Sequence, residues 1–189
     1  YIFLTTFPAG LAVIGTVPYS TASMYSLSVI PLFIVMGMFL SYGGLGSDLF
    51  RAVDAWARQI RGGMAIATVG ACAMFAAVSG SATATAATLG TIALPEMKKY
   101  KYDSALATGV VAAGGTLGIL IPPSTVLVLY GLLTELSVGK LLIAGLIPGI
   151  LQALLFMITI WIQVRLDPSK AMTAPPAPWG ERFSSIKSI

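Results

Sequence analysis

Two short runs hold the residue types that could bind an ion or a small solute. The first is the hydroxyl-rich run VSGSATAT (78–85), and the second is GGTLGILIPPS (114–124), which carries three glycines and two prolines. Hydroxyl oxygens are hard ligands that suit an alkali cation. Glycine and paired prolines interrupt a helix and leave backbone carbonyls without donors. The two runs therefore predict neutral-oxygen binding of an ion and a solute.

The residue types that several other kinds of site require are absent from the sequence. Histidine is absent and Cys72 is the only cysteine, so histidine-activated nucleophiles, His/Cys metal sites and an intrachain disulfide are excluded. The intervals 62–95 and 104–134 carry no charged residue, so no carboxylate proton relay and no charged substrate clamp is visible. GGTLG lacks the spacing of a dinucleotide fingerprint. We expect no enzyme activity and no cofactor.

The elements that must position these runs lie in a membrane. Of the 189 residues, 57% are apolar and only 10% are charged, against about 25% charged in an ordinary soluble domain. The net charge of +4 comes from basic residues that lie between apolar runs, so it does not indicate nucleic-acid binding. We expect an all-α polytopic membrane protein, and an apolar start without Met predicts a piece of a longer chain.

The charges divide the chain into segments. Residues 1–45 predict two transmembrane helices, the first truncated, with a turn-like break at Pro18–Ser23, and 141–164 predicts another transmembrane helix. The segment 46–61 predicts an amphipathic helix that lies in the membrane interface or docks on another part of the protein. The proline-containing segment 165–189 predicts a cytoplasmic linker or tail.

The amphipathic pattern of 46–61 divides its side chains between two faces. Leu49, Val53, Trp56 and Ile60 recur at helical spacing on one face. The charged residues fall on the other face: Asp48, Arg51, Asp54, Arg58 and Arg61.

The basic residues set an orientation for the segment 62–95. If 46–61 and 96–103 face the cytoplasm, only Lys140 of the 11 lysines and arginines lies outside, as the positive-inside rule expects. The segment 62–95 must then begin and end on one side. Its legs rise only about 21–24 Å each, which predicts a re-entrant hairpin with its tip at 79–81. The alternative is one continuous helix rich in small residues.

The second run lies inside the predicted span 104–130 and predicts a broken transmembrane helix. Pro123 also biases Pro122 away from the helical region. The alternative is a simple proline kink. Two interrupted segments in one chain are a pointer to the binding site of a secondary transporter. A channel or pore-forming subunit with a re-entrant loop is the main alternative, although no aromatic-glycine filter or charged ring is present.

At these residues the sequence resembles the large membrane subunit of tripartite ATP-independent periplasmic (TRAP) transporters, in its N-terminal half only. The matching stretches, in chain order, are IPLFIVMGMFL (30–40), GGMAIATVGACAMFAAVSGSATATAATLGTIALPEMKKYKYDSALATG (62–109), AAGGTLGILIPPSTVLVLYGLLTE (112–135) and AGLIPG (144–149).

The resemblance implies a sodium-coupled permease that imports an organic acid across the bacterial inner membrane. It implies three partners besides the lipid bilayer: a small membrane subunit, a periplasmic substrate-binding protein and the organic-acid substrate. It also implies half of an inverted-repeat elevator fold, in which 46–61 is an arm helix between scaffold and transport domain. The second half, with its own hairpin and sodium site, is missing from this chain.

The resemblance also implies the site residues. The expected sodium and substrate site comprises Ser79, Gly80, Ser81, Thr83, Gly114, Gly115, Thr116, Gly118, Pro122, Pro123 and Ser124. The expected Na⁺ ligands among them are Ser79, Ser81, Gly115, Thr116 and Gly118. Family members often carry a second serine where this chain has Ala82, so one hydroxyl ligand is expected to be lost.

Overall fold

The computed structural model describes residues 7–23, 27 and 29–172, and the single positions 175, 178, 180, 182 and 185. All regular structure in this part of the chain is helical, which confirms the all-α prediction. The chain divides into two units, residues 1–32 and residues 33–189, which are described separately. Most of the predicted tail beyond residue 172 lies outside the described residues.

The first unit contains α1, Phe7–Ala22. The predicted break at Pro18–Ser23 is wrong, because the helix continues through Pro18 to Ala22. The hydroxyls near Pro18 bond to carbonyls of their own helix: Thr16 Oγ1 donates to Ala12 O at 2.7 Å and Ser20 Oγ to Val17 O at 3.0 Å. These local bonds allow polar residues to stay helical, so the interruption begins only at Ser23.

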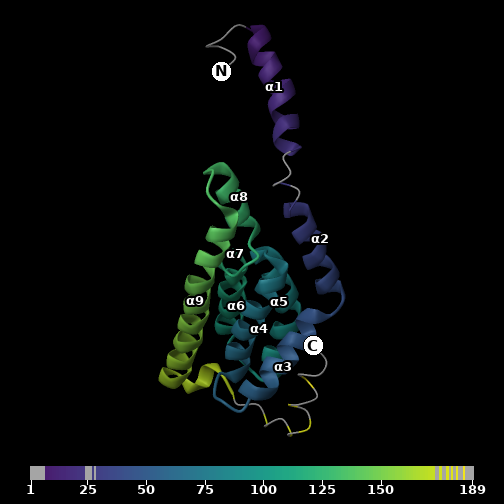
Figure 1. The fold of residues 1–189 in the computed structure, drawn as a ribbon. Helices are drawn as coiled ribbons and strands as arrows, with labels where there is room; N and C mark the ends of the chain where they lie inside the picture. The colour runs from purple at the N-terminus through teal and green to yellow at the C-terminus, as the bar shows by residue number, and fades with distance from the viewer. Residues whose placement is uncertain are drawn as a thin grey trace. The chain divides into compact units, whose positions relative to one another are not determined.

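The second unit holds α3 to α9 and the larger part of α2 (Figure 1). α2, Val29–Tyr42, begins in the first unit and runs into the second. It is followed by α3 (Leu45–Ala57), α4 (Gly63–Ser79), α5 (Ala82–Lys99), α6 (Ser104–Gly115), α7 (Leu117–Leu120), α8 (Thr125–Leu133), α9 (Val138–Leu166) and the 3₁₀ turn η2 (Pro168–Lys170).

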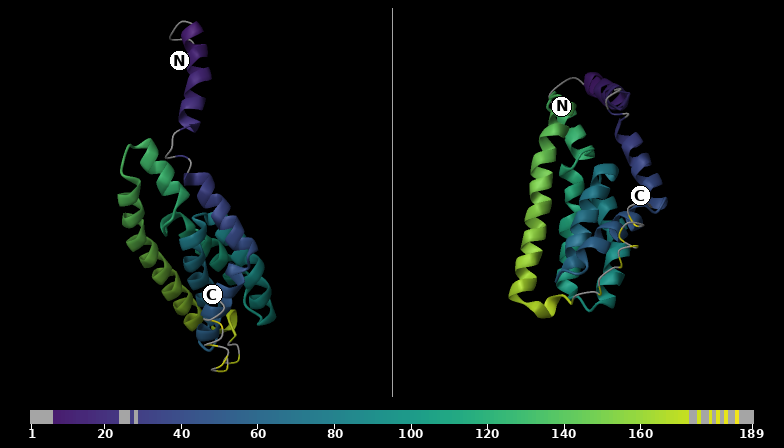
Figure 2. Two further views of the ribbon diagram at one scale, coloured as in Figure 1. Left: turned by 45° about the vertical axis from the view of Figure 1, so that its right-hand side comes forward. Right: turned by 60° about the horizontal axis from the view of Figure 1, so that its bottom comes forward.

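Among the described residues, α9 is the one helix long and apolar enough to cross a membrane by itself. Two bent pairs also qualify if each is counted as one span: residues 30–57, bent by 63°, and residues 104–133, bent by 43°. In both views of Figure 2, α9 (yellow-green) runs along one side of the bundle formed by α4 to α7.

The core of the second unit is built around α4, which contacts α3, α5, α6, α7 and α9. This helix is apolar on all sides, as expected for a helix enclosed by others. Val69, Cys72 and Phe75 are completely buried, and Leu89 and Met97 of α5 and Leu117 of α7 complete the core. Small residues on α4 allow these close approaches.

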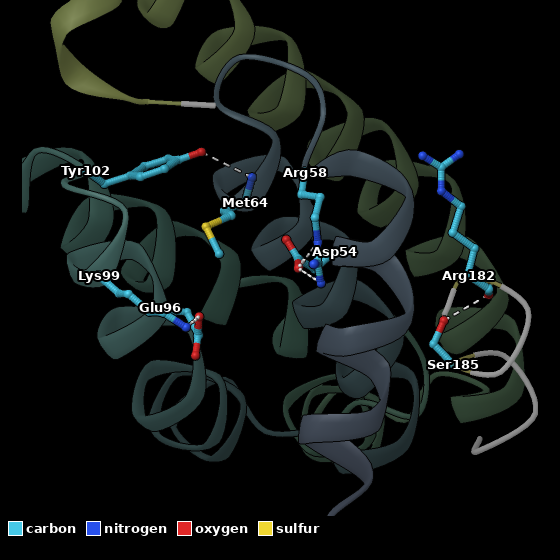
Figure 3. Close-up of polar contacts among 8 residues, drawn as sticks. All are labelled: Asp54, Arg58, Met64, Glu96, Lys99, Tyr102, Arg182 and Ser185. Carbon is cyan, nitrogen blue, oxygen red and sulfur yellow. Dashed lines mark hydrogen bonds and ion pairs between the residues drawn. The ribbon is translucent and has the colours of Figure 1, made fainter. Parts of the chain in front are cut away.

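The helix α3 ends at Ala57, four residues before the predicted end, and packs against α4 and α5. The predicted division of its faces is partly wrong. Asp54, expected on the polar face, is buried and pairs with Arg58 at 2.8 Å (Figure 3). The prediction for the apolar face is not overturned, since Leu49 is buried and an apolar face in the membrane interface leaves Trp56 and Ile60 exposed, at 44% and 50%. The ion pair allows Asp54 to be buried, since it supplies the charge with a partner.

Three segments meet at one end of the second unit, which we call the basic end. It consists of the α3–α4 turn (58–62), the α5–α6 turn (100–103) and the end of α9 with η2 (164–170). The Met64 N–H donates to the Tyr102 hydroxyl at 3.3 Å, and the Asp103 N–H donates to Lys170 O at 2.9 Å. A Cβ added at Gly62 would lie 3.0 Å from Val164 Cγ2. Both ends of the α4–α5 hairpin therefore lie together.

Candidate functional site

The turn between α4 and α5 is built from a glycine and a serine. Gly80 has φ +60°, a conformation that glycine adopts at little cost, and its N–H donates to Ala76 O at 3.0 Å. Ser81 is extended and caps α5, because its Oγ accepts from the Ala84 N–H at 3.3 Å. Ser79, expected at the tip, is the last residue of α4. The hairpin thus turns within two residues.

A buried hydroxyl pair lies directly under this turn. Ser79 Oγ is 2.9 Å from Thr85 Oγ1, and Thr85 Oγ1 donates to Ser81 O at 2.8 Å. Thr85 has one hydroxyl proton, and that proton goes to the Ser81 carbonyl, so Ser79 must be the donor in the pair. The lone pairs of Ser79 Oγ are then available to accept a bond or to bind a cation.

The second run forms a broken helix. α6 ends at Gly115, α7 occupies one short turn, and the chain is then irregular through residues 121–124 before α8 begins. Pro122 and Pro123 have no N–H, so they cannot donate to the carbonyls of Gly118 and Ile119 four residues earlier. The Ser124 hydroxyl replaces one of these donors, at 2.5 Å from Ile119 O. It also caps α8 by accepting from the Leu127 N–H at 3.2 Å.

The two runs meet in what we call the tip–break junction, residues 79–83 with 114–125. The hydrogen bonds across it join Gly80 to Thr125, which lies 45 positions later in the sequence. The N–H and the hydroxyl of Thr125 both donate to Gly80 O, at 3.3 and 3.1 Å. A Cβ added at Gly80 would collide with Pro123 O, and one added at Gly118 would lie 2.7 Å from the carbonyl carbon and oxygen of Ser81. Both glycines therefore allow backbone to touch backbone.

The neighbouring helices α2 and α9 also reach this region. A Cβ added at Gly37 of α2 would lie 3.1 Å from Ser79 Cα. On α9, a Cβ at Gly145 would lie 2.7 Å from Leu120 O, and one at Gly149 would lie 2.8 Å from Ile121 Cγ1. Gly145 and Gly149, four positions apart on α9, thus allow α9 to pack against the broken helix.

Not every expected residue lies where the runs touch. Gly114 faces α4, since an added Cβ would lie 2.8 Å from Cys72 Sγ. Thr83 is exposed and lies 3.1 Å, Oγ1 to Oγ, from Ser81. Thr116 donates to Ala113 O at 2.6 Å and accepts from Gln152 Nε2 at 3.2 Å, so its hydroxyl is directed toward α9.

The remaining expected residues divide in the same way. Gly115 faces the start of α5, with Ala86 Cβ 2.7 Å and Ala82 O 3.2 Å from an added Cβ, while Pro122 is half-buried. The members at which the hairpin tip and the broken helix touch are Gly80, Ser81, Gly115, Gly118, Pro123 and Ser124, and Ser79 lies directly under the turn.

Sequence reasoning missed Thr125 and Gln152. Thr125 makes the bonds that join the two runs, and Gln152 Oε1 is buried without a partner among the described residues. An amide inside an apolar transmembrane segment is a functional candidate by default, so the signal for Gln152 was present in the sequence. Thr125 carries no such signal, because only the fold shows what its hydroxyl meets.

The electrostatics of the junction come from helix ends. The carbonyl end of α4 and the amide ends of α5 and α8 converge there, so partial charges of both signs are available. No group of three His, Cys, Asp or Glu that could hold a metal ion occurs in the described part. The polar groups that the junction presents are hydroxyls, backbone carbonyls and helix-end amides, all of them neutral.

Comparisons with known proteins follow this geometry. A family model described as "Tripartite ATP-independent periplasmic transporter, DctM component" matches residues 1–182. The C4-dicarboxylate TRAP transporter large permease protein DctM of Pseudomonas aeruginosa is 47% identical over 154 residues, covering 82% of this chain and 36% of that relative.

Two further relatives differ in what their names say they transport. The isethionate TRAP transporter permease protein DctMQ of Oleidesulfovibrio alaskensis is 38% identical over 144 residues, with 76% of this chain and 23% of the relative covered. The ectoine TRAP transporter large permease protein TeaC of Halomonas elongata is 35% identical over 164 residues, with 86% and 38% covered. The chain thus spans between 23% and 38% of these relatives.

Proposed function

This chain belongs to the DctM family of tripartite ATP-independent periplasmic transporters, and on that premise we propose that it forms part of a sodium-coupled permease that imports an organic acid. The relatives are membrane permeases and not enzymes. In this proposal the complete subunit lies in the bacterial inner membrane, works with a small membrane subunit, and receives its substrate from a periplasmic binding protein.

The tip–break junction carries the proposal. Its backbone contacts and the two bonds from Thr125 to Gly80 O hold the hairpin tip against the broken helix. Such paired interruptions, with helix ends directed at one point, are how secondary transporters bind ions and solutes at membrane depth. Neutral hydroxyls and carbonyls supply the ligands, because the runs that meet here contain no charged residue.

The depth of the tip along α9 supports a re-entrant hairpin. The broken helix next to the tip contacts α9 at Gly145 and Gly149. From Gly149 to Leu166, at the basic end, α9 rises about 26 Å, and it continues about 17 Å beyond Gly149 in the other direction. Because a hydrocarbon core is about 30 Å thick, a basic end at the headgroups leaves the tip inside the membrane. Figure 1 shows α8 extending beyond the α4–α5 turn.

The proposed sodium site uses Ser79, Ser81, Gly115, Thr116 and Gly118. Ser79 Oγ keeps its lone pairs free. The Gly118 carbonyl has no helical donor, because Pro122, four residues later, has no N–H. Thr116 would have to turn from Gln152 to join the site. The substrate site would lie beside it, with Thr83, Pro123 and Ser124, and the rest of the subunit would supply the other wall.

The substrate is an organic acid in this proposal. Two of the relatives' names specify C4-dicarboxylate and isethionate, which are anions, whereas a third specifies ectoine. The amide ends of α5 and α8 suit a carboxylate or sulfonate group. We further propose an elevator movement; the buried core that α4 to α7 share with α3 and α9 supports the movement of packed helices as one body.

The test is the sodium dependence of uptake by the full-length protein with its partners in proteoliposomes. The assay uses whichever of a C4-dicarboxylate, isethionate or ectoine the unaltered protein takes up. For Ser81→Ala we expect the half-saturating sodium concentration to rise about tenfold, since a bond to a charged group is lost. Ser137→Ala is the control, because Ser137 precedes α9 without any side-chain cap.

Three outcomes would contradict the proposal. An unchanged sodium curve in Ser81→Ala would remove Ser81 as a ligand. Uptake by the unaltered protein that is independent of sodium, or ionic current without the binding protein, would replace the symporter with the channel alternative.

A further inference from the structure

A groove at the basic end is unrelated to the tip–break junction. It has a volume of about 300 Å³ and is lined by Ile60, Arg61, Trp161, Val164 and Arg165. The lining residues come from the α3–α4 turn and from the last two turns of α9. We propose that this groove, which we call the arginine groove, binds the headgroup of an anionic phospholipid.

The arginine groove carries two basic side chains, Arg61 and Arg165. Neither Arg61 nor Arg165 has an acidic partner among the described residues, although Arg58 nearby is paired with Asp54. The Asp167 carboxylate, two residues beyond Arg165, pairs instead with Lys170 Nζ at 3.9 Å and accepts two hydrogen bonds from Ser169, which hold its pKa below the usual range. Two guanidinium groups at one groove match the oxygens of a phosphate.

The apolar part of the arginine groove distinguishes a lipid from a soluble anion. Ile60 and Trp161 are 50% and 44% exposed beside the arginines, and Val164 forms a buried floor. The Arg165 guanidinium lies over the Trp161 ring at 4.6 Å, which places an amphipathic pair at the end of the spanning helix. Tryptophan and arginine at such an end are typical of the headgroup level of a membrane.

The backbone keeps the arginine groove in place. Gly62 has φ +76°, and a Cβ there would lie 3.0 and 3.6 Å from side-chain atoms of Val164 and Ile160. The α3–α4 turn is therefore held against α9, with Arg61 beside Arg165. Basic sites between helices at the cytoplasmic side are known to attract anionic headgroups. The inference rests on the membrane orientation proposed above but not on sodium coupling or transport.

The test is native mass spectrometry of the full-length protein in detergent, titrated with phosphatidylglycerol or with zwitterionic phosphatidylethanolamine, without sodium or substrate. The unaltered protein should retain phosphatidylglycerol preferentially. The double variant Arg61→Gln/Arg165→Gln should bind it about 30-fold more weakly, at about one basic residue's contribution for each change. Lys98→Gln/Lys99→Gln is the charge-matched control, because these lysines lie at the end of α5 and do not line the groove.

A second variant distinguishes a loss of lipid binding from a loss of folding. Ile60→Glu adds a negative charge at an exposed position of the groove and should also release phosphatidylglycerol. Equal lipid retention in all variants, or an equal loss in the lysine control, would overturn the proposal. Displacement of the lipid by inorganic phosphate at millimolar concentration would assign the groove to a soluble anion instead. Because transport is not measured, a failed symporter proposal leaves this result interpretable.

Discussion

At the residue scale, single atoms decide whether the hairpin tip can meet the broken helix. Gly80 combines a left-handed backbone with a carbonyl that accepts two bonds from Thr125 and with direct contact to Pro123. Any side chain at Gly80 would push the tip away from its partner. The role of this glycine in the fold is therefore steric.

We predict that Gly80→Ala lowers the stability of the full-length protein by about 2 kcal/mol or more, from left-handed strain and the collision with Pro123 O. The measurement is thermal unfolding in detergent. Gly109→Ala is the matched control, since Gly109 lies on α6 with nothing within 4 Å of an added Cβ. That change should be neutral or slightly stabilising. Equal melting temperatures for the two variants would remove the steric role.

At the element scale, the turns at the basic end tie helix ends together. The Tyr102 hydroxyl, from the α5–α6 turn, accepts a hydrogen bond from the Met64 N–H in the first turn of α4 (Figure 3). Burial raises the pKa of Tyr102 to about 12, the Met64 bond partly offsets this, and the Asp54 carboxylate adds to it. One side chain thus links both ends of the hairpin.

We predict that Tyr102→Phe destabilises the protein by about 1 kcal/mol at neutral pH through the lost bond. The pH dependence has a definite sign. The pKa of Tyr102 is about 12 in the folded protein and near 10 in the unfolded chain. The contribution of Tyr102 to the free energy of unfolding is therefore fully present below pH 10 and is lost as the pH rises from 10 to 12.

Thermal unfolding at pH 9, 10, 11 and 12 tests this dependence. The unaltered protein should lose stability over this range more steeply than Tyr102→Phe. Tyr42→Phe, at an 86% exposed position, should retain the steep dependence. Identical slopes for all three proteins would show that Tyr102 does not titrate with folding.

At the scale of the whole molecule, charged residues from three turns lie together at the basic end. This arrangement agrees with the predicted topology, in which both ends of the α4–α5 hairpin lie on the same side of the membrane. In the full-length protein with Cys72→Ala, we expect single cysteines at Arg61 and Lys98 to react with an impermeant reagent from the same side of the membrane. A cysteine at Lys140 should react from the opposite side. Labelling of Arg61 and Lys98 from opposite sides would restore the continuous-helix alternative.

Part of this molecule could be read from its residues alone. Scarce charges and long apolar intervals predict membrane helices, because composition reflects the solvent around a chain. The glycines and prolines of 114–124 predict an interruption, since these residues act on their own backbone. The motifs also identify the family. These features depend on residues acting on their own stretch of backbone, so the sequence predicts them. The predicted break near Pro18 was wrong because the neighbouring hydroxyls bond to carbonyls of their own helix.

Only the tertiary structure decided which atoms meet. That Thr125 reaches Gly80 O, that Ser79 donates to Thr85, and that Asp54 is buried beside Arg58 depend on how whole helices pack. Sequence spacing constrains contacts within a helix, whereas contacts between residues 45 positions apart follow from the shapes of several helices at once. The sequence by itself thus determined an interrupted, all-helical membrane protein, and the packing decided the geometry of its candidate site.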